Sequence, residues 1–581
     1  MTQPARHRRF YVKLASLGLA GAFVLPLAAL GENLPAPATA GAPAVTAAHG
    51  MVVAQEKLAA RIGADILQKG GNAVDAAVAV GFAMAVTYPR AGNIGGGGFM
   101  IIHRAGDENV AIDYREVAPQ AINKTSFLDA QGNADPAKSR DSALAIGVPG
   151  TVAGLALAEE KYGSGHFKLA DLIAPAIALA RDGIAVADDT ADSLPVDRAR
   201  LARWPSSATI FLKPDGAALA QGDRLVQPEL ANTLQAVAAG GPRAFYEGET
   251  AQKLAAAIQA AGGVMTAADL KSYRAVERTP IRGTYRGYDI LSMPPPSSGG
   301  VVLVEMLNIL EGYDLAHANE AHAVFLMVEA MKRAYADRAF FLGDPDAVKV
   351  PVAQLISKSY AGEWRATIDP AHATAAKDIH PTAAPARSEG RNTTHFSVID
   401  RFGNAVSNTY TLNFSYGVGL VAAGTGVLLN NELDDFAAKA DAPNAYGLLG
   451  FEANAPGPGK RPLSSMTPTI VLKDGKPFLV TGTPGGSRII SAVLQVVVDV
   501  IDRGMDIASA VSAPRVHNQW MPDQVWAEPA LPAYLVAALQ ACGDTVTVQK
   551  FPTSANSILA TPSGFAGAAD PRTRGALAVG Y

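Results

Sequence analysis

An abrupt change in the character of the chain at residues 369–392 constrains the fold more than any other feature. This stretch holds Pro370, Pro381 and Pro385 among alanines, threonines and charged residues, and it has no apolar periodicity. It therefore predicts an exposed, irregular segment. Helical patterns dominate the middle of the chain before it, and strand patterns follow it directly. Helices covering stacked strands predict a layered α/β sandwich.

The patterns before this segment predict two early helices, two buried strands and a long helical region. Residues 55–68 have helical apolar spacing with a glycine stop at 70–71, and residues 73–87 are apolar nearly all round, as in a buried helix. The strands are predicted at 99–102 and 110–114. From about 151 to 343 the chain is predicted to be mostly helical, with examples at 169–181, 251–261 and 320–341.

The patterns after the segment predict two hairpins and one buried helix. Strands at 394–400 and 405–412 flank the turn residues 401–404, and strands at 469–472 and 477–481 flank residues 473–476. Residues 488–500 then read as a helix inside the core.

The first 40 residues are typical of an export signal. Arg6, Arg8, Arg9 and Lys13 precede a mainly apolar stretch at 14–30, and Ala-x-Ala sequences follow at 36–38 and 38–40. The route, general or twin-arginine, stays open, and an uncleaved membrane anchor is the alternative. No later stretch reaches the ~18 to 20 apolar residues of a membrane span. We therefore expect a mature protein that is periplasmic or secreted, with no membrane contact after signal removal.

Composition excludes several other kinds of protein. Cys542 is the single cysteine among 581 residues, so neither an intramolecular disulfide nor a cysteine-based zinc site can form. The net charge is −4, and no basic block with interleaved aromatic residues suggests a nucleic-acid partner.

Thr393 stands at the first position of a predicted strand, directly after the irregular segment. A threonine hydroxyl is a poor nucleophile unless a base lies beside it. If the Asn392–Thr393 bond is broken, the new α-amine lies near the hydroxyl of the same residue. Such amines titrate near ~7.7 to 8.0, so the amine can act as a base at neutral pH. The alternative is an ordinary strand threonine.

Several ordered motifs make the cleavage reading specific. Residues 393–397 (TTHFS) resemble the processing site of the γ-glutamyltransferase family, an N-terminal-nucleophile hydrolase family. Other matching segments occur in family order: 70–76, 92–100, 113–116, 430–436, 461–466, 482–488, 570–572 and 580–581. The resemblance extends from about Ala48 to the C-terminus. It implies a four-layer αββα sandwich, formed jointly by a large chain of residues 41–392 and a small chain of residues 393–581 after self-cleavage.

The resemblance also implies a role for individual residues. Thr393 is the nucleophile, Thr411 supports its hydroxyl, and Gly485 and Gly486 form the oxyanion hole. Bare backbone N–H groups at the start of the predicted helix at 488 suit that last role, because they can approach a developing oxyanion closely.

The substrate head implied by the family is an α-amino acid with one carboxylate and one ammonium. Its carboxylate is expected to bind Arg115, whose guanidinium fork suits bidentate pairing, together with Ser464 and Ser465. Its ammonium is expected to bind Asp435, helped by Asn413 and Glu432. Tyr446, within residues 437–451, resembles part of a segment that covers the pocket.

The function implied is γ-glutamyl transfer from glutathione or a related amide to water or to an amino acid or peptide amine, without a metal or organic cofactor. A related acylase of the cephalosporin type is the nearest alternative, and the acidic Asp435 counts against it. A non-catalytic exported binding protein is a second alternative. His395 shares a strand face with Thr393 and could be read as a base. We interpret it as structural, because the free amine already supplies a base.

Overall fold

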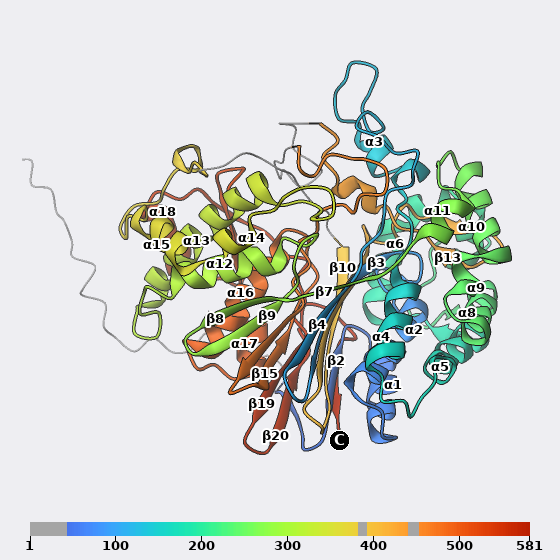
Figure 1. Cartoon of the computed structure of the whole chain (residues 1–581), viewed down its shortest axis with the longest axis horizontal. Helices are drawn as coiled ribbons and strands as arrows, with labels where there is room; N and C mark the ends of the chain where they lie inside the picture. Colours follow the sequence, from blue (N-terminus) through green and yellow to red (C-terminus); the bar gives the residue numbers. More distant parts are fainter. Residues whose placement is uncertain (1–42, 382–391, 440–451) are drawn as a thin grey trace, which may run out of the picture. The chain divides into compact units, whose positions relative to one another are not determined.

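Two seven-stranded antiparallel sheets lie face to face in the computed structural model, which describes residues 43–381, 392–439 and 452–581 (Figure 1). We call them sheet A, with strand order β1-β20-β19-β15-β14-β9-β8, and sheet B, with order β21-β2-β10-β11-β3-β4-β7. The strands of sheet A are β1 (Val45–Ala47), β8 (Ile281–Tyr285), β9 (Tyr288–Ser292), β14 (Thr469–Lys473), β15 (Lys476–Thr481), β19 (Ser557–Thr561) and β20 (Gly564–Ala568). The strands of sheet B are β2 (Met51–Ala54), β3 (Gly97–Arg104), β4 (Glu108–Tyr114), β7 (Val276–Arg278), β10 (Asn392–Ile399), β11 (Ala405–Asn413) and β21 (Leu577–Gly580).

Helices cover the outer face of each sheet, as Figure 1 shows on its two sides. Sheet B is covered by α1 (Lys57–Gln68), α2 (Ala73–Thr87), α4 (Thr151–Tyr162), α5 (Leu169–Asp182), α8 (Pro228–Gly240), α10 (Gly248–Ala260) and α11 (Ala267–Ser272). Sheet A is covered by α12 (Gly299–Leu310), α13 (Glu320–Phe341), α15 (Lys358–Ala366), α16 (Arg488–Ile501), α17 (Ile507–Ser512) and α18 (Ala533–Ala541).

Three apolar layers hold these elements together. One lies between sheet B and its helices, and a second lies between sheet A and its helices. The third lies between the sheets, where Phe99 and Ile101 of sheet B meet Ile470 and Val480 of sheet A. Burying apolar surface on both faces of each sheet is what a four-layer sandwich requires. The predicted αββα sandwich is therefore confirmed.

Most predicted elements are present within a few residues of their expected bounds. The apolar segment at 73–87 is α2, in which every residue is buried, and an Asn72–Asp75 capping box begins it. The hairpins predicted around residues 401–404 and 473–476 are β10–β11 and β14–β15.

The region at 151–343 is mostly helical as predicted, but it also contains β7, β8 and β9, which the sequence patterns did not indicate. Tyr285 pairs with Tyr288 across a two-residue turn in which Arg286 has φ 52° and Gly287 has φ 83°. Positive φ at both positions defines a type I′ hairpin turn. An Arg-Gly pair is a weaker sequence signal for it than Asn-Gly, which explains the miss.

Both sheets draw strands from each side of residue 393. In sheet B, β10, β11 and β21 follow this position, and β2, β3, β4 and β7 precede it. Sheet A likewise combines β1, β8 and β9 with β14, β15, β19 and β20. The two segments on either side of Thr393 are therefore interleaved, and neither contains a complete sheet.

Some expectations concern residues outside the described ranges. The export signal at 1–40 and residues 382–391 of the irregular segment are among them, and the boundary at 392–393 stays a prediction. Residues 369–381 contain no helix or strand beyond the 3-10 turn Ala376–Asp378. No helix among the described residues is long and apolar enough to span a membrane.

Candidate active site

Thr393 lies at the start of β10, in the middle of sheet B, opposite Thr411 of β11. The register is irregular at this point: Asn392 pairs with Asn413, whereas Thr393 pairs with Thr411. Leu412 is thus an extra residue, forming a β-bulge opposite the Asn392–Thr393 peptide bond. Asn413, beside the bulge, has a left-handed φ of 72°. The predicted cleavage site therefore coincides with the one described irregularity in this strand pair.

Most of the predicted site residues line a single pocket. The lining residues are Arg115, Thr393, Thr411, Asn413, Glu432, Asp435, Ser464, Ser465, Met466, Gly486 and Ile489. Gly485 precedes a lining residue but is not itself part of the lining. Tyr446 falls outside the described residues, and of Asn392 only the strand pairing is described. Residues far apart in the sequence thus converge on the hydroxyl-bearing end of β10.

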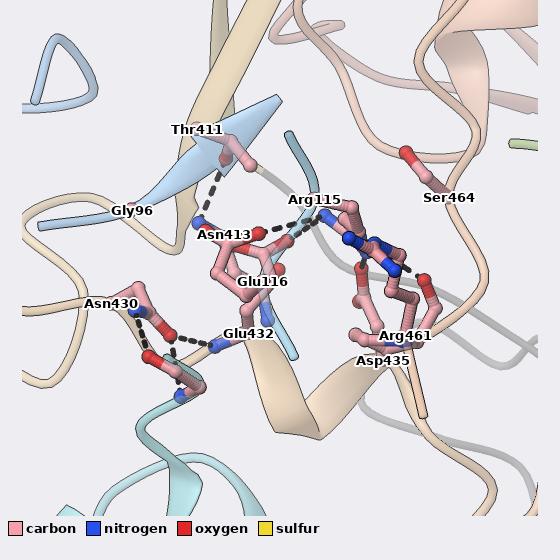
Figure 2. Close-up of polar contacts among 12 residues, drawn as sticks. Gly96, Arg115, Glu116, Thr411, Asn413, Asn430, Glu432, Asp435, Arg461 and Ser464 are labelled. Atoms are coloured by element: carbon pink, nitrogen blue, oxygen red, sulfur yellow. Dashed lines mark hydrogen bonds and ion pairs between the residues drawn. The ribbon is translucent and has the colours of Figure 1, made fainter. Parts of the chain in front are cut away.

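A buried guanidinium forms the charged centre of this pocket (Figure 2). Arg115 pairs with Glu432 through Nη1 and with Asp435 through Nη2, the latter at 2.5 Å. Its Nε and Nη2 also donate to the carbonyls of Pro462 and Leu463, at 3.1 and 3.2 Å. Such extensive hydrogen bonding is what permits a charge to be buried at 1% exposure. The fork is fixed in position before any ligand enters.

Asn413 presents an acceptor to the same pocket. Its Nδ2 donates to the carbonyl of Asn431 at 2.9 Å, and this contact defines which way the amide is turned. Its Oδ1 is buried and has no hydrogen-bond partner among the described residues. An unpaired buried acceptor carries a desolvation cost, so a donor group in the pocket would be bound favourably.

The two serines have hydroxyl protons directed by their surroundings. Ser464 Oγ accepts from the N–H of Met466 at 3.1 Å, and Ser465 Oγ accepts from Nη2 of Arg338 at 3.2 Å. Neither hydroxyl donates to a described residue, so each keeps a proton available for an incoming acceptor such as a carboxylate. The serines and Arg115 thus supply donors, while Asp435 and Asn413 supply acceptors.

Two further carboxyl groups lie at or near this centre. Glu116 is fully buried, with Oε2 3.8 Å from Arg115 Nη1, and burial raises its pKa to about 7 despite the nearby guanidinium. Asp434 accepts from the Ser139 hydroxyl and does not line the pocket. Burial raises the pKa of Asp434 to about 6. Only the second member of the Asp434–Asp435 pair therefore faces the site.

The glycine loop at 482–487 joins β15 to α16. Gly485 has φ 139° and Gly486 has φ 60°, values that side chains rarely tolerate. Among the described residues, the N–H groups of these two glycines donate to no acceptor, whereas the N–H groups of Arg488 and Ile489 donate to the carbonyls of Gly485 and Gly486, at 3.3 and 3.0 Å. Gly486 lines the pocket together with Thr393, and the two N–H groups just before a 14-residue helix are suited to stabilise an oxyanion.

His395 is buried inside the sandwich rather than in the pocket. Its Nδ1 lies 2.8 Å from Thr409 Oγ1 and its Nε2 lies 3.0 Å from Ser397 Oγ. Burial lowers its pKa to about 3, so the ring is neutral at physiological pH. These contacts favour the structural interpretation.

Asn430 is a positioning residue that the sequence patterns did not single out. Its Oδ1 accepts from the N–H groups of Gly147 and Glu432, and its Nδ2 donates to the carbonyls of Gly95 and Gly147 (Figure 2). It thereby joins the Glu432 turn to two loops of the first half of the chain. Its position in the 430–436 motif is the sequence signal that could have identified it.

A second, larger pocket also has Thr393 in its lining. It shares no lining residue with the first pocket except Thr393 itself. Arg90, Arg572 and Asp189 supply its charged groups, and Tyr88 and Phe551 supply aromatic surface. Thr393 thus stands between a small pocket with paired charges and a larger, mixed one.

A threonine at the start of a strand, inside a sandwich of two antiparallel sheets and beside unused backbone donors, defines the class of N-terminal-nucleophile hydrolases. Residues 59–580 match the family described as gamma-glutamyltranspeptidase. The glutathione hydrolase proenzyme of Escherichia coli (strain K12) is 50% identical over 541 residues, covering 92% of this chain and 93% of that protein. The chain belongs to the gamma-glutamyltranspeptidase family.

Solved structures agree with this assignment. The cephalosporin acylase from Bacillus halodurans superposes with a TM-score of 0.82 at 28% identity, covering 95% of this chain and 99% of that one. The gamma-glutamyltranspeptidase of Helicobacter pylori gives a TM-score of 0.54 at 46% identity, covering 56% of this chain and 93% of that one. The first likeness spans the whole sandwich, and the second has the higher identity.

Proposed function

We propose that this protein is a self-processing γ-glutamyltransferase that also hydrolyses glutathione. One observation carries the proposal: Thr393 lines the same small pocket as Arg115 and Asp435. A paired guanidinium and carboxylate in one pocket match the carboxylate and ammonium of an α-amino acid head. Thr393, which lines the same pocket, would then attack the γ-carbonyl.

Maturation begins in the intact chain. The Thr393 hydroxyl attacks the carbonyl carbon of Asn392, a C–O bond forms, and the C–N bond breaks. The nitrogen keeps both electrons and takes up the hydroxyl proton, so the products are an Asn392 ester and a free α-amine. Water then hydrolyses the ester. The β-bulge opposite this bond and the left-handed Asn413 support the assignment, because irregular backbone often accompanies reactive sites.

Turnover uses the same hydroxyl with a new base. The α-amine of Thr393 accepts the hydroxyl proton as oxygen attacks the γ-carbonyl, and the N–H groups of Gly485 and Gly486 stabilise the oxyanion. Collapse expels the leaving amine and leaves a γ-glutamyl ester on Thr393. The second pocket beside Thr393 offers a path for that amine, and for the water or acceptor amine that resolves the ester.

An acylase acting on a side chain without an ammonium is the second candidate. The likeness to the cephalosporin acylase favours it at the level of fold. Asp435 and the unpaired Asn413 Oδ1 weigh against it, because a glutaryl-type head has no donor for them. Export to the periplasm or medium, with large and small chains held together as a heterodimer, completes the proposal.

Intact mass and N-terminal sequencing of the purified protein test this function first. Wild type should give two chains, the smaller beginning at Thr393, and should release nitroaniline from γ-glutamyl-p-nitroanilide. Thr393→Ala should remain one chain without activity. Thr394→Ala is the matched control, since Thr394 is the adjacent buried threonine and its hydroxyl donates to Gln55 instead. One full-length chain in wild type would refute self-processing and favour the binding-protein alternative.

A further inference from the structure

Ser487, the residue directly after Gly486, occupies the N-cap of α16 but does not cap it. A serine at this position usually has extended backbone and accepts an N–H of the first turn with its Oγ. Here φ is −54° and ψ is −29°, and the side chain makes no cap hydrogen bond. Its Oγ instead donates to Oε1 of Gln519 at 2.8 Å. The Ser487 side chain therefore makes a contact outside the helix and not the usual capping contact within it.

Gln519 belongs to a buried chain of hydrogen bonds with a defined direction. Its Nε2 donates to the carbonyl of Met521 at 3.3 Å, so its Oε1 is the atom that faces Ser487 and His517. Because Oε1 only accepts, His517 donates from Nε2 at 3.1 Å and presents Nδ1 as an acceptor to Ser491 Oγ at 2.8 Å. The ring of His517 stacks on Trp526 with centroids 5.3 Å apart. This packing leaves the Gln519 amide little freedom.

A second contact holds Ser487 from the opposite half of the chain. The hydroxyl of Tyr335, in α13, donates to the carbonyl oxygen of Ser487. Tyr335 is 1% exposed, so this hydrogen bond is shielded from water. Ser487 is therefore held at its side chain by Gln519 and at its carbonyl by Tyr335.

We propose that Tyr335 and Gln519 are positioning residues that hold the N–H groups of Gly485 and Gly486 in the geometry of the oxyanion hole. The proposal rests on the proposed function. Two consecutive glycines with positive φ have wide conformational freedom, so the loop does not hold its own donors in place. Oxyanion stabilisation depends on donors fixed in advance, and Ser487 is the residue next to Gly486 at which side chains of other elements hold this loop.

One consequence concerns the two chains. Tyr335 precedes Thr393 in the sequence, whereas Gly485 and Gly486 follow it. The large chain thus orients the oxyanion hole of the small chain. Arg338, one turn further along α13, also links residues on the two sides of position 393. It donates to Ser298 Oγ, before that position, and to Ser465 Oγ, after it.

The test uses Tyr335→Phe and Gln519→Leu, purified after self-cleavage and assayed with γ-glutamyl-p-nitroanilide. Each variant should lower kcat about 10-fold or more, since a displaced oxyanion donor weakens transition-state binding. KM and the inhibition constant of L-glutamate should stay within about 2-fold of wild type, because the pocket for the amino acid head is unchanged. The two variants act on different contacts, so full kcat in either one overturns the proposal even if the other fails to fold.

Tyr285→Phe is the matched control. Tyr285 is also fully buried, and its hydroxyl donates at 2.7 Å to Asp502, the C-cap of the same helix α16. This variant should lose thermal stability comparably while kcat stays at the wild-type value. An equal fall in kcat would mean that general loosening of α16, not the Ser487 contact, is responsible. Failure of wild type to cleave itself or turn over would instead refute the proposed function, a separate outcome.

Discussion

Arg115 and Asp435, 320 positions apart in the sequence, form a buried ion pair with 2.5 Å between Nη2 and Oδ2. Under the proposed function these are the groups that bind the carboxylate and the ammonium of the substrate. In the structure without ligand they satisfy one another. A zwitterionic head can replace this pairing group for group, whereas a head with only one charge leaves either the cation or the anion poorly matched. The pair is thus a basis for discriminating among acyl groups.

Replacing Asp435 by Asn tests this discrimination. The KM for γ-glutamyl-p-nitroanilide should rise about 10- to 100-fold, the loss expected for a hydrogen bond to a charged group. The KM for glutaryl-p-nitroanilide, which lacks the ammonium, should change little. Asp434→Asn is the control, because this adjacent buried carboxyl faces Ser139 and not the pocket. Equal effects on both substrates would contradict the assignment of Asp435.

Removing the Thr411 hydroxyl should slow self-cleavage. Thr411 lies opposite Thr393 across the strands, its Oγ1 accepts from the N–H of Asn413 at 2.7 Å, and under the proposed function its hydroxyl supports the nucleophile. Thr411→Val should lengthen the half-life of the precursor about 10-fold or more, whereas Thr411→Ser should process near the wild-type rate. Timed mass analysis of freshly purified precursor measures this. If both variants processed the precursor at the same rate, the Thr411 hydroxyl would not be needed for self-cleavage.

Replacing His395 should separate stability from catalysis. His395→Asn should lower the free energy of unfolding by about 1–3 kcal/mol, since two buried side-chain contacts are lost. The pH dependence of kcat/KM between pH 6 and 9 should keep its midpoint, because burial holds the pKa of His395 near 3 and the ring does not titrate there. If the variant lost the change in kcat/KM between pH 6 and 9 altogether, His395 would instead be the base.

Glu116 should make the folded protein less stable as pH rises toward neutrality. Its pKa is raised by burial to about 7, above the ordinary carboxyl value of 4.5, while Arg115 opposes the shift and Asp435 adds to it. The folded state therefore holds a proton that the unfolded state loses between these two values, and stability falls across this window by at most about 1.4 kcal/mol per pH unit. Urea unfolding of wild type and Glu116→Gln at pH 5 and pH 7.5 measures the difference.

The variant should lose less stability than wild type over that interval. Glu160→Gln, at an exposed position of α4, serves as the control and should follow wild type. Parallel behaviour of Glu116→Gln and wild type would show that Glu116 is already ionised at pH 5. Asp434 also has a raised pKa, so only the difference between variant and wild type, and not the wild-type slope, reports on Glu116.

The sequence predicted those elements whose signal is local. The all-apolar run of α2 and the hairpin of β10 and β11 depend on residues close together in the chain. The small strands β7, β8 and β9 were missed, because an Arg286–Gly287 turn inside a mostly helical region is a weak sequence signal for a hairpin. At the site, motif order identified which residues converge, but not their mutual contacts. That Arg115 pairs with Asp435, and that Tyr335 reaches Ser487, depends on packing between segments more than a hundred residues apart.

The interleaving of strands from both sides of residue 393 has a consequence for how the native state persists. While the chain is continuous, folding is a unimolecular process, and strands from both segments are delivered to each sheet together. Under the proposed function the Asn392–Thr393 bond is then cut, and the same arrangement would have to be regained by two separate chains, each with unpaired strand edges prone to aggregation. A cut at this position would therefore make folding irreversible. The lifetime of the cleaved protein would then be set by the height of its unfolding barrier and not by an equilibrium with its denatured chains.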